Sequence, residues 1–448
     1  MGKPDAGLLD QKSRPARDSE SLHTEQSARP WHLYTRARRA TFLWVLFGVG
    51  VSNYVDKNVI SVLLEQIKTE FQVSDSMLGL LSGISFALLY ATLGIPVARW
   101  ADRGDRTVII TLSLSIWSVM TIVCGFTSNF WQLVAARFGV GAGEAGAIPP
   151  AQSLIADYYS PSERGKAIGI FMMSGSAGYV LGLIVGGLIA EEYGWRVTFI
   201  VVGLAGFVLT PLTHLILKEP RRVPEFALRA ASAESVISSV RALVAKPAYC
   251  NLLGGIVVYF LMCYGAFVFI VSFMIRVHGL STAEAGVRFG AVSALGAIVG
   301  SIGGGHLADR LAARNIAWLA RVSGLGLIAA IPLYELALWS PSVAMMTGFL
   351  FVASILQTAA VPAAFCAVHI VCGSRRRAFS MALVLFCANL LGLGLGPIVT
   401  GVLSDEFGSV YGSGEGLRYA LMTVVIVLIP AGWLLLRAAR HLERDAED

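Results

Sequence analysis

Charged residues are scarce in this sequence. Asp, Glu, Lys and Arg make up 14% of its 448 residues, whereas hydrophobic residues make up 55%. Because a soluble globular domain carries about 25% charged residues, this composition excludes an ordinary soluble protein. Apolar runs long enough to cross a bilayer recur along the whole chain, which predicts an all-α membrane protein.

Sequence motifs for catalysis and for metal binding are also absent. The seven histidines form no H-x-x-x-H or H-E-x-x-H pattern, and the chain has neither G-x-S-x-G nor a Walker lysine motif. The glycines of 139–143 superficially resemble a dinucleotide-binding loop, but they lie inside an apolar run with no strand before them. We therefore expect no enzyme activity, no ATP-driven step, no cofactor, no metal and no nucleic-acid partner.

The apolar runs predict twelve membrane-spanning helices in two groups of six. The predicted spans cover approximately 40–63, 77–99, 107–126, 129–153, 165–190, 195–217, 249–276, 283–307, 315–336, 341–371, 376–403 and 415–437. We expect an N-terminal half at 36–217 and a C-terminal half at 249–437. A linker with an amphipathic helix at 218–248 joins them, between a disordered cytoplasmic tail at 1–35 and a second tail at 438–448.

Basic residues predict the orientation of these spans. Clusters of Arg and Lys precede the first span, fill the linker, follow the last span, and occupy the loops that lie on the same side as these segments. By the positive-inside rule both termini are cytoplasmic. Short loops and the lack of a targeting signal favour a bacterial inner membrane, with membrane lipids as surroundings and a monomer as the expected state.

The two predicted halves repeat each other. The residues 101–103, Ala-Asp-Arg, recur at 308–310, an offset of 207, and further along the chain Pro149 aligns with Pro362 at an offset of 213. Internal repeats of this kind are typical of transporters, whose site lies near the middle of the membrane between the halves.

The fourth predicted span contains Arg137 and Glu144. Seven residues correspond to two helical turns, so both side chains lie on nearly one face, roughly 10 Å apart along the axis. A charge in mid-membrane costs on the order of 3 kcal/mol, and the glycines between the two residues are too small to shield it. Another helix must therefore bring polar partners. The pair is either a structural ion pair that locks helices or, as we favour, part of a water-accessible cavity.

Aligning the halves shows that the charged groups belong to the first half only. Asp56 of the first span aligns with Cys263, and Glu144 aligns with Gln357. This difference predicts a cavity with one charged wall and one apolar wall. Such a cavity suits an amphipathic solute better than a sugar.

Two loop motifs resemble those of the major facilitator superfamily. Gly94 and the residues 101–106, Ala-Asp-Arg-Gly-Asp-Arg, are similar to its signature between spans two and three, with the glycine displaced by one position. The residues 157–165, Asp-Tyr-Tyr-Ser-Pro-Ser-Glu-Arg-Gly, resemble its loop between spans four and five. The resemblance covers nearly the whole chain and implies two six-helix halves that alternate access to one central site.

Two segments of the first half resemble the spinster family more narrowly. They are 53–57, Asn-Tyr-Val-Asp-Lys, and 139–145, Gly-Val-Gly-Ala-Gly-Glu-Ala, followed by a matching continuation at 149–157. The resemblance implies a proton-linked secondary transporter of amphipathic lipids, of the lysophospholipid or sphingoid type. A proton-coupled symporter of small organic anions is the alternative, and a non-transporting sensor that keeps the fold is a further one.

The candidate site residues have distinct expected roles. We expect Asp56 and Glu144 to be the proton-coupling carboxylates, because burial and a neighbouring arginine act on a carboxyl group in opposite directions. Arg137 would hold a carboxylate or the solute's anion. Lys57 is expected to point elsewhere and to be structural. Further candidates for substrate binding are Asn53, Tyr54, Gln357 and Asn389. Candidates for inter-span gating contacts are Asp102, Arg103, Arg106, Asp157, Arg164, Asp309 and Arg310.

The proposed role of Glu144 can be tested by its neutral isostere. Replacing Glu144 by Gln should abolish proton-driven transport and leave expression unchanged, because the amide cannot bind and release a proton. Transport assayed across a range of pH values checks this. Full pH-dependent transport by the variant would refute the assignment.

Overall fold

The structure is a computed structural model that describes residues 30–222 and 236–446. Within these residues the chain is helical, and no strand occurs among them. The predicted tail at 1–35 lies mostly outside the described residues, as does part of the linker.

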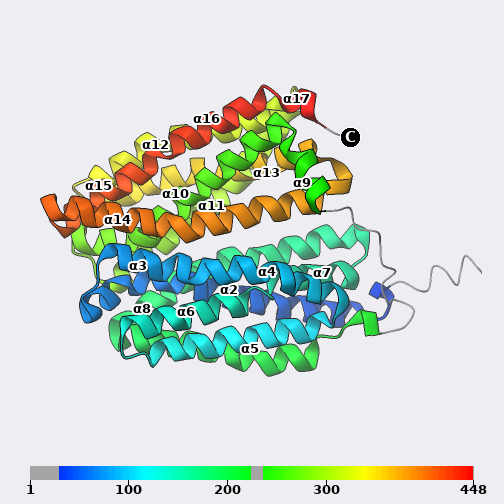
Figure 1. Cartoon of the computed structure of the whole chain (residues 1–448), viewed down its shortest axis with the longest axis horizontal. Helices are drawn as coiled ribbons and strands as arrows, with labels where there is room; N and C mark the ends of the chain where they lie inside the picture. Colours follow the sequence, from blue (N-terminus) through cyan, green and yellow to red (C-terminus); the bar gives the residue numbers. More distant parts are fainter. Residues whose placement is uncertain (1–29, 223–235, 447–448) are drawn as a thin grey trace, which may run out of the picture.

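The first half is built from seven α-helical segments (Figure 1). After the short helix η1 (Pro30–His32) these are α2 (Arg36–Phe71), α3 (Asp75–Ser82), α4 (Ile84–Arg103), α5 (Arg106–Gly125), α6 (Phe130–Glu144), α7 (Ile148–Tyr158) and α8 (Pro161–Ile216).

The linker and the second half follow. The linker contains η2 (Pro220–Arg222) and α9 (Val236–Val244), where the sequence predicts an amphipathic helix. The second half contains α10 (Pro247–His278), α11 (Thr282–Ala312), α12 (Ala317–Trp339), α13 (Val343–Cys387), the π-helical segment η4 (Ala388–Leu393), α14 (Gly394–Tyr411), α15 (Ser413–Ile426), α16 (Leu428–Ala439) and α17 (Leu442–Asp445).

Single glycines divide the two longest helices. Gly194 inside α8 has φ 80° and ψ 168°, and Gly373 inside α13 has φ 66° and ψ 172°. Side chains with a Cβ avoid this conformation, so glycine allows the chain to turn sharply there. The fifth and sixth predicted spans therefore both lie in α8. The tenth predicted span ends just before Gly373, and the eleventh begins just after it.

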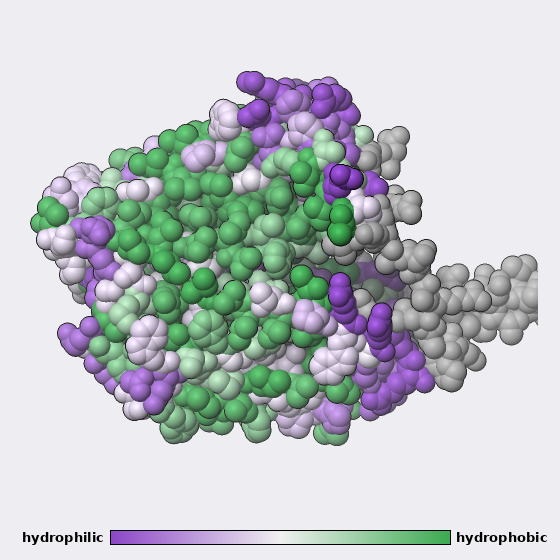
Figure 2. All heavy atoms as spheres, viewed as in Figure 1, coloured by the Kyte–Doolittle hydropathy of each residue, from purple (hydrophilic) through white to green (hydrophobic). Residues whose placement is uncertain are grey.

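Among the described residues, nine segments are long and apolar enough to cross a membrane. One of them, Pro161–Arg222, holds two predicted spans, while the first and fourth predicted spans fall in α2 and in α6 with α7. The count of twelve stays a prediction. Figure 2 shows the surface expected of a membrane protein, with apolar side chains over the middle and hydrophilic ones toward the two ends.

The two halves form separate layers that meet along α2, α3, α4 and α8 on one side and α10, α11, α14 and η4 on the other (Figure 1). We call the end at which α8 leads into the linker, near α9 and α17, the linker end. Contacts between the halves gather at the opposite end. There the carboxylate of Asp405 accepts hydrogen bonds from the backbone N–H groups of Asp75 and Ser76, at 2.9 and 2.8 Å.

An arginine of the second half strengthens this contact. Arg276 of α10 pairs with Glu65 of α2 at 2.7 Å and with Asp75 of α3 at 2.6 Å. Its guanidinium matches the geometry of carboxylates, so the three side chains hold α10 against both helices.

Glycines allow the backbones of the halves to touch at this end. A Cβ on Gly79 would lie 2.3 Å from the carbonyl oxygen of Pro397, and one on Gly401 would lie 2.2 Å from that of Asp75. Toward the linker end the halves separate (Figure 1), and Figure 2 shows the surface hollowed between them.

The contact at Gly401 can be tested directly. Gly401→Ala should lower the free energy of unfolding by about 1–3 kcal/mol, because the added methyl group overpacks a backbone contact. Gly303→Ala is the matched control, since a Cβ there meets nothing within 4 Å. The control should be neutral or stabilising by about 0.5–1 kcal/mol through helix propensity. Unfolding of both purified variants in detergent gives the comparison, and equal stabilities would contradict the close contact.

Candidate functional site

A buried ion pair joins α2 to α6. Arg137 Nη1 lies 3.2 Å from Asp56 Oδ1, and the hydroxyl of Thr121 on α5 donates a hydrogen bond to the other carboxylate oxygen. Both charged side chains are at least 98% buried. Three helices of the first half therefore converge on Asp56, and its carboxylate points into the bundle rather than toward lipid.

A second ion pair joins the same two helices. Lys57 Nζ lies 3.1 Å from Glu144 Oε2, and the amide of Asn53 donates to the same oxygen at 2.8 Å. Lys57 also donates to Asn53 Oδ1 at 2.9 Å, one helical turn away. Asn53 thus orients both partners.

These contacts exclude one alternative, a direct ion pair between Arg137 and Glu144, and they correct the expectation for Lys57. Arg137 pairs with Asp56 and not with Glu144, and Lys57 does not point elsewhere but supplies the cation that Glu144 needs. Adjacent helix residues project about 100° apart, which suggests separate sites for Asp56 and Lys57. The long, flexible lysine stem overcomes this difference and reaches a second position on α6.

The glycines of α6 make this arrangement possible. A Cβ on Gly141 would lie 2.3 Å from the carbonyl oxygen of Phe86, and one on Gly143 would lie 2.6 Å from the backbone nitrogen of Trp117. α4 and α5 therefore approach the α6 backbone closely. As the sequence predicts, neighbouring helices come near this face.

Some hydrogen-bonding capacity stays unused in the site. Glu144 Oε1 and Arg137 Nε are buried and have no hydrogen-bond partner among the described residues. Leaving a buried polar atom unpaired costs about 1–3 kcal/mol. Both atoms can therefore engage a further polar group, and Glu144 Oε1 offers a position for a proton.

Aromatic rings surround the cations, and sequence reasoning missed two of them. Lys57 Nζ lies 4.4 Å from the ring centroid of Tyr90, 5.3 Å from that of Tyr54 and 5.6 Å from that of Phe86. The Phe86 ring also lies 5.4 Å from the guanidinium carbon of Arg137. Phe86 and Tyr90 are four residues apart on α4, which is a helical spacing that marks a shared face.

The second half contributes a neutral polar cluster. The Gln357 amide on α13 donates to Tyr259 Oη at 3.2 Å and to Cys263 Sγ at 3.0 Å, and the Tyr334 hydroxyl donates to the Gln357 carbonyl oxygen. The aligned positions Cys263 and Gln357 are thus in contact. This wall is neutral, as expected, but it offers more hydrogen bonds than the apolar wall that the sequence predicts.

Apolar side chains extend from this cluster. A cavity of about 40 Å³ beside Gln357 and Tyr334 is lined by Phe267, Phe289 and Leu350 together with smaller residues. Asn389 of η4 is not part of the group, because its amide donates to the carbonyl of Leu385, one turn earlier at the end of α13, at 2.8 Å. Among the described residues, Asn389 makes no hydrogen bond to the cluster.

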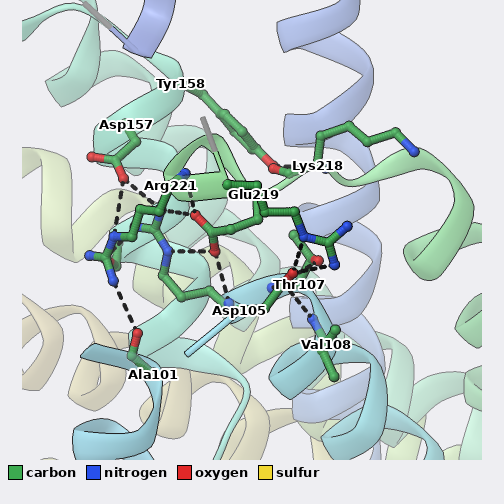
Figure 3. Close-up of polar contacts among 12 residues, drawn as sticks. Ala101, Asp105, Thr107, Val108, Asp157, Tyr158, Lys218, Glu219 and Arg221 are labelled. Carbon is green, nitrogen blue, oxygen red and sulfur yellow. Dashed lines mark hydrogen bonds and ion pairs between the residues drawn. The ribbon is translucent and has the colours of Figure 1, made fainter. Parts of the chain in front are cut away.

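A separate charged cluster, shown in Figure 3, ties the linker end of the first half together. The guanidinium of Arg106 at the start of α5 pairs with Glu219 at 2.5 Å and with Asp157 of α7 at 2.6 Å. Glu219 also accepts from the backbone N–H of Arg106 at 2.8 Å. Arg221 adds a hydrogen bond to the carbonyl of Ala101 at 3.1 Å.

Asp105 begins α5 beside this cluster. Its carboxylate accepts from the backbone N–H groups of Thr107 and Val108 and from the side chain of Arg222. Partial burial would raise the pKa of Asp105, but the hydrogen bonds from Thr107 and Val108 and the nearby Arg222 outweigh it and hold this pKa below its usual value. Asp105 therefore stays ionised at neutral pH and caps the helix.

The predicted gating residues divide into three groups. Arg106 and Asp157 form the expected inter-span contact, but within one half, and the sequence missed Glu219 as its centre. Arg103, Asp309 and Arg310 are exposed and form no ion pair in the described part of the chain.

The third group consists of Arg164 and Asp102. Arg164 donates to the carbonyl of Ala156 at 2.6 Å rather than to a carboxylate. The side chain of Asp102 lies outside the described residues.

The cluster predicts a stability effect. Glu219→Gln should lower the free energy of unfolding by about 3 kcal/mol, because it removes a charge partner from the buried Arg106. Glu406→Gln is the control, since Glu406 is exposed and its side chain forms no ion pair among the described residues. Denaturant unfolding of both variants measures the difference. A loss equal to that of the control would show that Glu219 is not the anchor.

Three comparisons with known proteins agree on the class. An MFS-type efflux pump of Mycolicibacterium smegmatis is 30% identical over 90% of this chain and 92% of its own. The sphingosine-1-phosphate transporter SPNS2 of Danio rerio is 25% identical over 97% and 91%. The crystal structure of a bacterial homolog to the human lysosomal transporter spinster, in an inward-facing and occupied conformation, superposes on this chain with a TM-score of 0.83 at 32% identity. The match covers 93% of this chain and 100% of that one.

The model of the Major Facilitator Superfamily matches residues 46–337, more than half of the chain. The helical bundle, its two layers and the relatives that span nearly its full length lead to one conclusion. The chain belongs to the Major Facilitator Superfamily and is a spinster-like, multi-pass membrane transporter.

Proposed function

We propose that this transporter moves amphipathic lipids with an anionic head group, of the lysophospholipid or sphingoid type, in a proton-linked cycle. The observation that carries the proposal is the pair of buried ion pairs, Asp56–Arg137 and Glu144–Lys57, on one side of the bundle. Each carboxylate pairs with a cation that could otherwise bind the anionic group of a substrate.

The two walls of the site suit the two ends of an amphiphile. The first half supplies cations for a phosphate group, which guanidinium and ammonium groups bind well. The second half supplies neutral hydrogen-bonding groups and, beside them, Phe267, Phe289 and Leu350 for an alkyl chain. A relative named as a sphingosine-1-phosphate transporter supports the same substrate class.

Proton linkage follows from competition for the cations. A proton on Glu144 would neutralise its carboxylate and release Lys57, and a proton on Asp56 would release Arg137. The Lys57 side chain is 17% exposed and that of Arg137 is 1% exposed, so Lys57 is the cation that an entering head group meets first. When either carboxylate loses its proton, it would pair with its own cation again and displace the anionic group of the substrate.

The arrangement of the halves supplies the alternating access. Arg276, Asp75 and Asp405 hold the halves together at the end opposite the linker. By the positive-inside rule the linker end is cytoplasmic, so this state would be open to the cytoplasm. The exposed Arg103, Asp309 and Arg310 would then form their gating contacts only when the linker end closes.

Uptake by proteoliposomes tests the function. Purified protein should take up a labelled lysophospholipid faster when a pH gradient is imposed than without one, because proton binding is coupled to release of the cation. Unlabelled lysolipid should compete with the label, and short-chain organic acids should not.

The control variant is Glu406→Gln, which removes an exposed carboxylate that forms no ion pair among the described residues and should keep gradient-driven uptake. Asp56→Asn should lose it. Competition by short-chain acids instead of lysolipids would favour an organic-anion symporter. No uptake of either solute under any gradient would favour a sensor and contradict transport of both.

A further inference from the structure

A short pattern in α8 occurs again in α14. Gly187 is followed four residues later by Glu191, and Gly401 is followed four residues later by Asp405. One offset of 214 residues relates the two glycines and the two acids, so the pattern is part of the internal repeat. A spacing of four places the glycine and the acid on one face of a helix, one turn apart.

In both places this face meets the start of a helix in the other half. The Asp405 carboxylate accepts hydrogen bonds from the first two backbone N–H groups of α3. The Glu191 carboxylate accepts one from the backbone N–H of Ala283, in the first turn of α11, at 2.6 Å. The Ser281 side chain also interacts with the Glu191 carboxylate. Each half therefore caps a helix of the other.

The glycines allow these helix starts to come close. A Cβ on Gly187 would lie 3.2 Å from the carbonyl oxygen of Thr282, as one on Gly401 would meet that of Asp75. Asp75 and Thr282 are the first residues of α3 and α11, and they are related by the repeat offset of 207. Matched residues thus make the same contact twice at the end opposite the linker.

Caps of this kind exist only while the halves touch. The first four N–H groups of a helix lack partners within the helix, and a carboxylate there also interacts with the positive end of the helix dipole. In each helix a serine of its own half, Ser74 or Ser281, already caps one N–H group. Separation of the halves at this end would therefore remove the carboxylate caps and leave each helix its serine.

The two caps differ in strength. Asp405 is half-buried, and the helix start that it caps is held by two further groups. Arg276 pairs with the Asp75 carboxylate at 2.6 Å, and the Ser404 hydroxyl donates to it at 2.6 Å. Glu191 is exposed and forms no ion pair in the described part of the chain. Since carboxylates stabilise a helix start more when they are partly buried, Asp405 is the stronger cap.

We infer that Glu191 and Asp405 are a matched pair of gating residues, whose carboxylate caps together hold the end opposite the linker closed and set how often it opens. Neither residue belongs to the ion-pair site of α2 and α6. This role therefore goes beyond the proposed function and holds for any substrate.

Hydrogen exchange of the full-length protein in detergent tests the pair. Asp405→Ala and Glu191→Ala should each speed backbone exchange about 2- to 30-fold at the starts of both α3 and α11, because loss of a cap favours separation of the halves there. Exchange should slow in 99–103 and 305–312 at the linker end, because that end closes when the other opens. Asp405→Ala should have the larger effect.

Glu406→Ala and Glu192→Ala are the matched controls. Each removes the neighbouring acid, which is exposed and forms no ion pair among the described residues, so exchange should not change at either end. Asp405→Asn keeps one acceptor oxygen and should fall between the wild type and Asp405→Ala, and it decides the question if the alanine variant does not fold.

The reciprocal change at the linker end separates a gate from a purely structural cap. Faster exchange confined to the helix that lost its cap, with 99–103 and 305–312 unchanged, would overturn the inference. Unchanged exchange at both helix starts would overturn it as well. The assay contains no substrate, so its result is independent of the proposed substrate class.

Discussion

The pairing of two cations with two carboxylates inside an apolar bundle is the constraint on which the site depends. Any of these four groups left alone would carry a large desolvation penalty, so each must lie against its partner. Asp56 takes Arg137, and Glu144 takes Lys57. The four charges sum to zero, and the pairs bind α2 to α6. A proton or an anion that enters the site therefore changes the balance of both pairs.

Close helix packing follows from the same requirement. Gly141 and Gly143 on α6 let α4 and α5 approach, which brings Phe86 and Thr121 beside the charges. At the end of the bundle opposite the linker, Gly79 and Gly401 in the same way let the backbones of the two halves touch. The glycines thus decide where backbones touch, while the charged groups decide which helices must touch. The charged cluster at Arg106 differs, because it fixes helix ends within the first half and spans no interface between halves.

The sequence predicted the site best at charged residues, because an unpaired charge inside an apolar span has a high desolvation cost. Arg137 and Glu144 stand out because charges are rare in apolar spans, and the structure does give each a polar partner. The alignment of the halves marked Cys263 and Gln357 only as the neutral counterparts of Asp56 and Glu144, and the structure shows that the two side chains are in contact. Sequence reasoning also has a limit at the first-half pairs. It could not show that Lys57 reaches Glu144, since helical spacing describes the Cβ direction and not the end of a long side chain. Glu219 was missed because nothing in a charged loop marks which acid is buried.

Composition and periodicity alone determined that this chain is a helical membrane protein. Uninterrupted apolar runs of about 20 residues satisfy their backbone hydrogen bonds in a bilayer as helices, whereas the strands of a membrane barrel are shorter and alternate apolar with polar residues. Composition and periodicity also determined which residues need partners. The tertiary structure decided which partner each one has, which aromatic rings enclose Lys57 and which end of the bundle is held shut. Those choices depend on contacts between residues far apart in the chain, such as Asp75 with Asp405, and no local pattern records them.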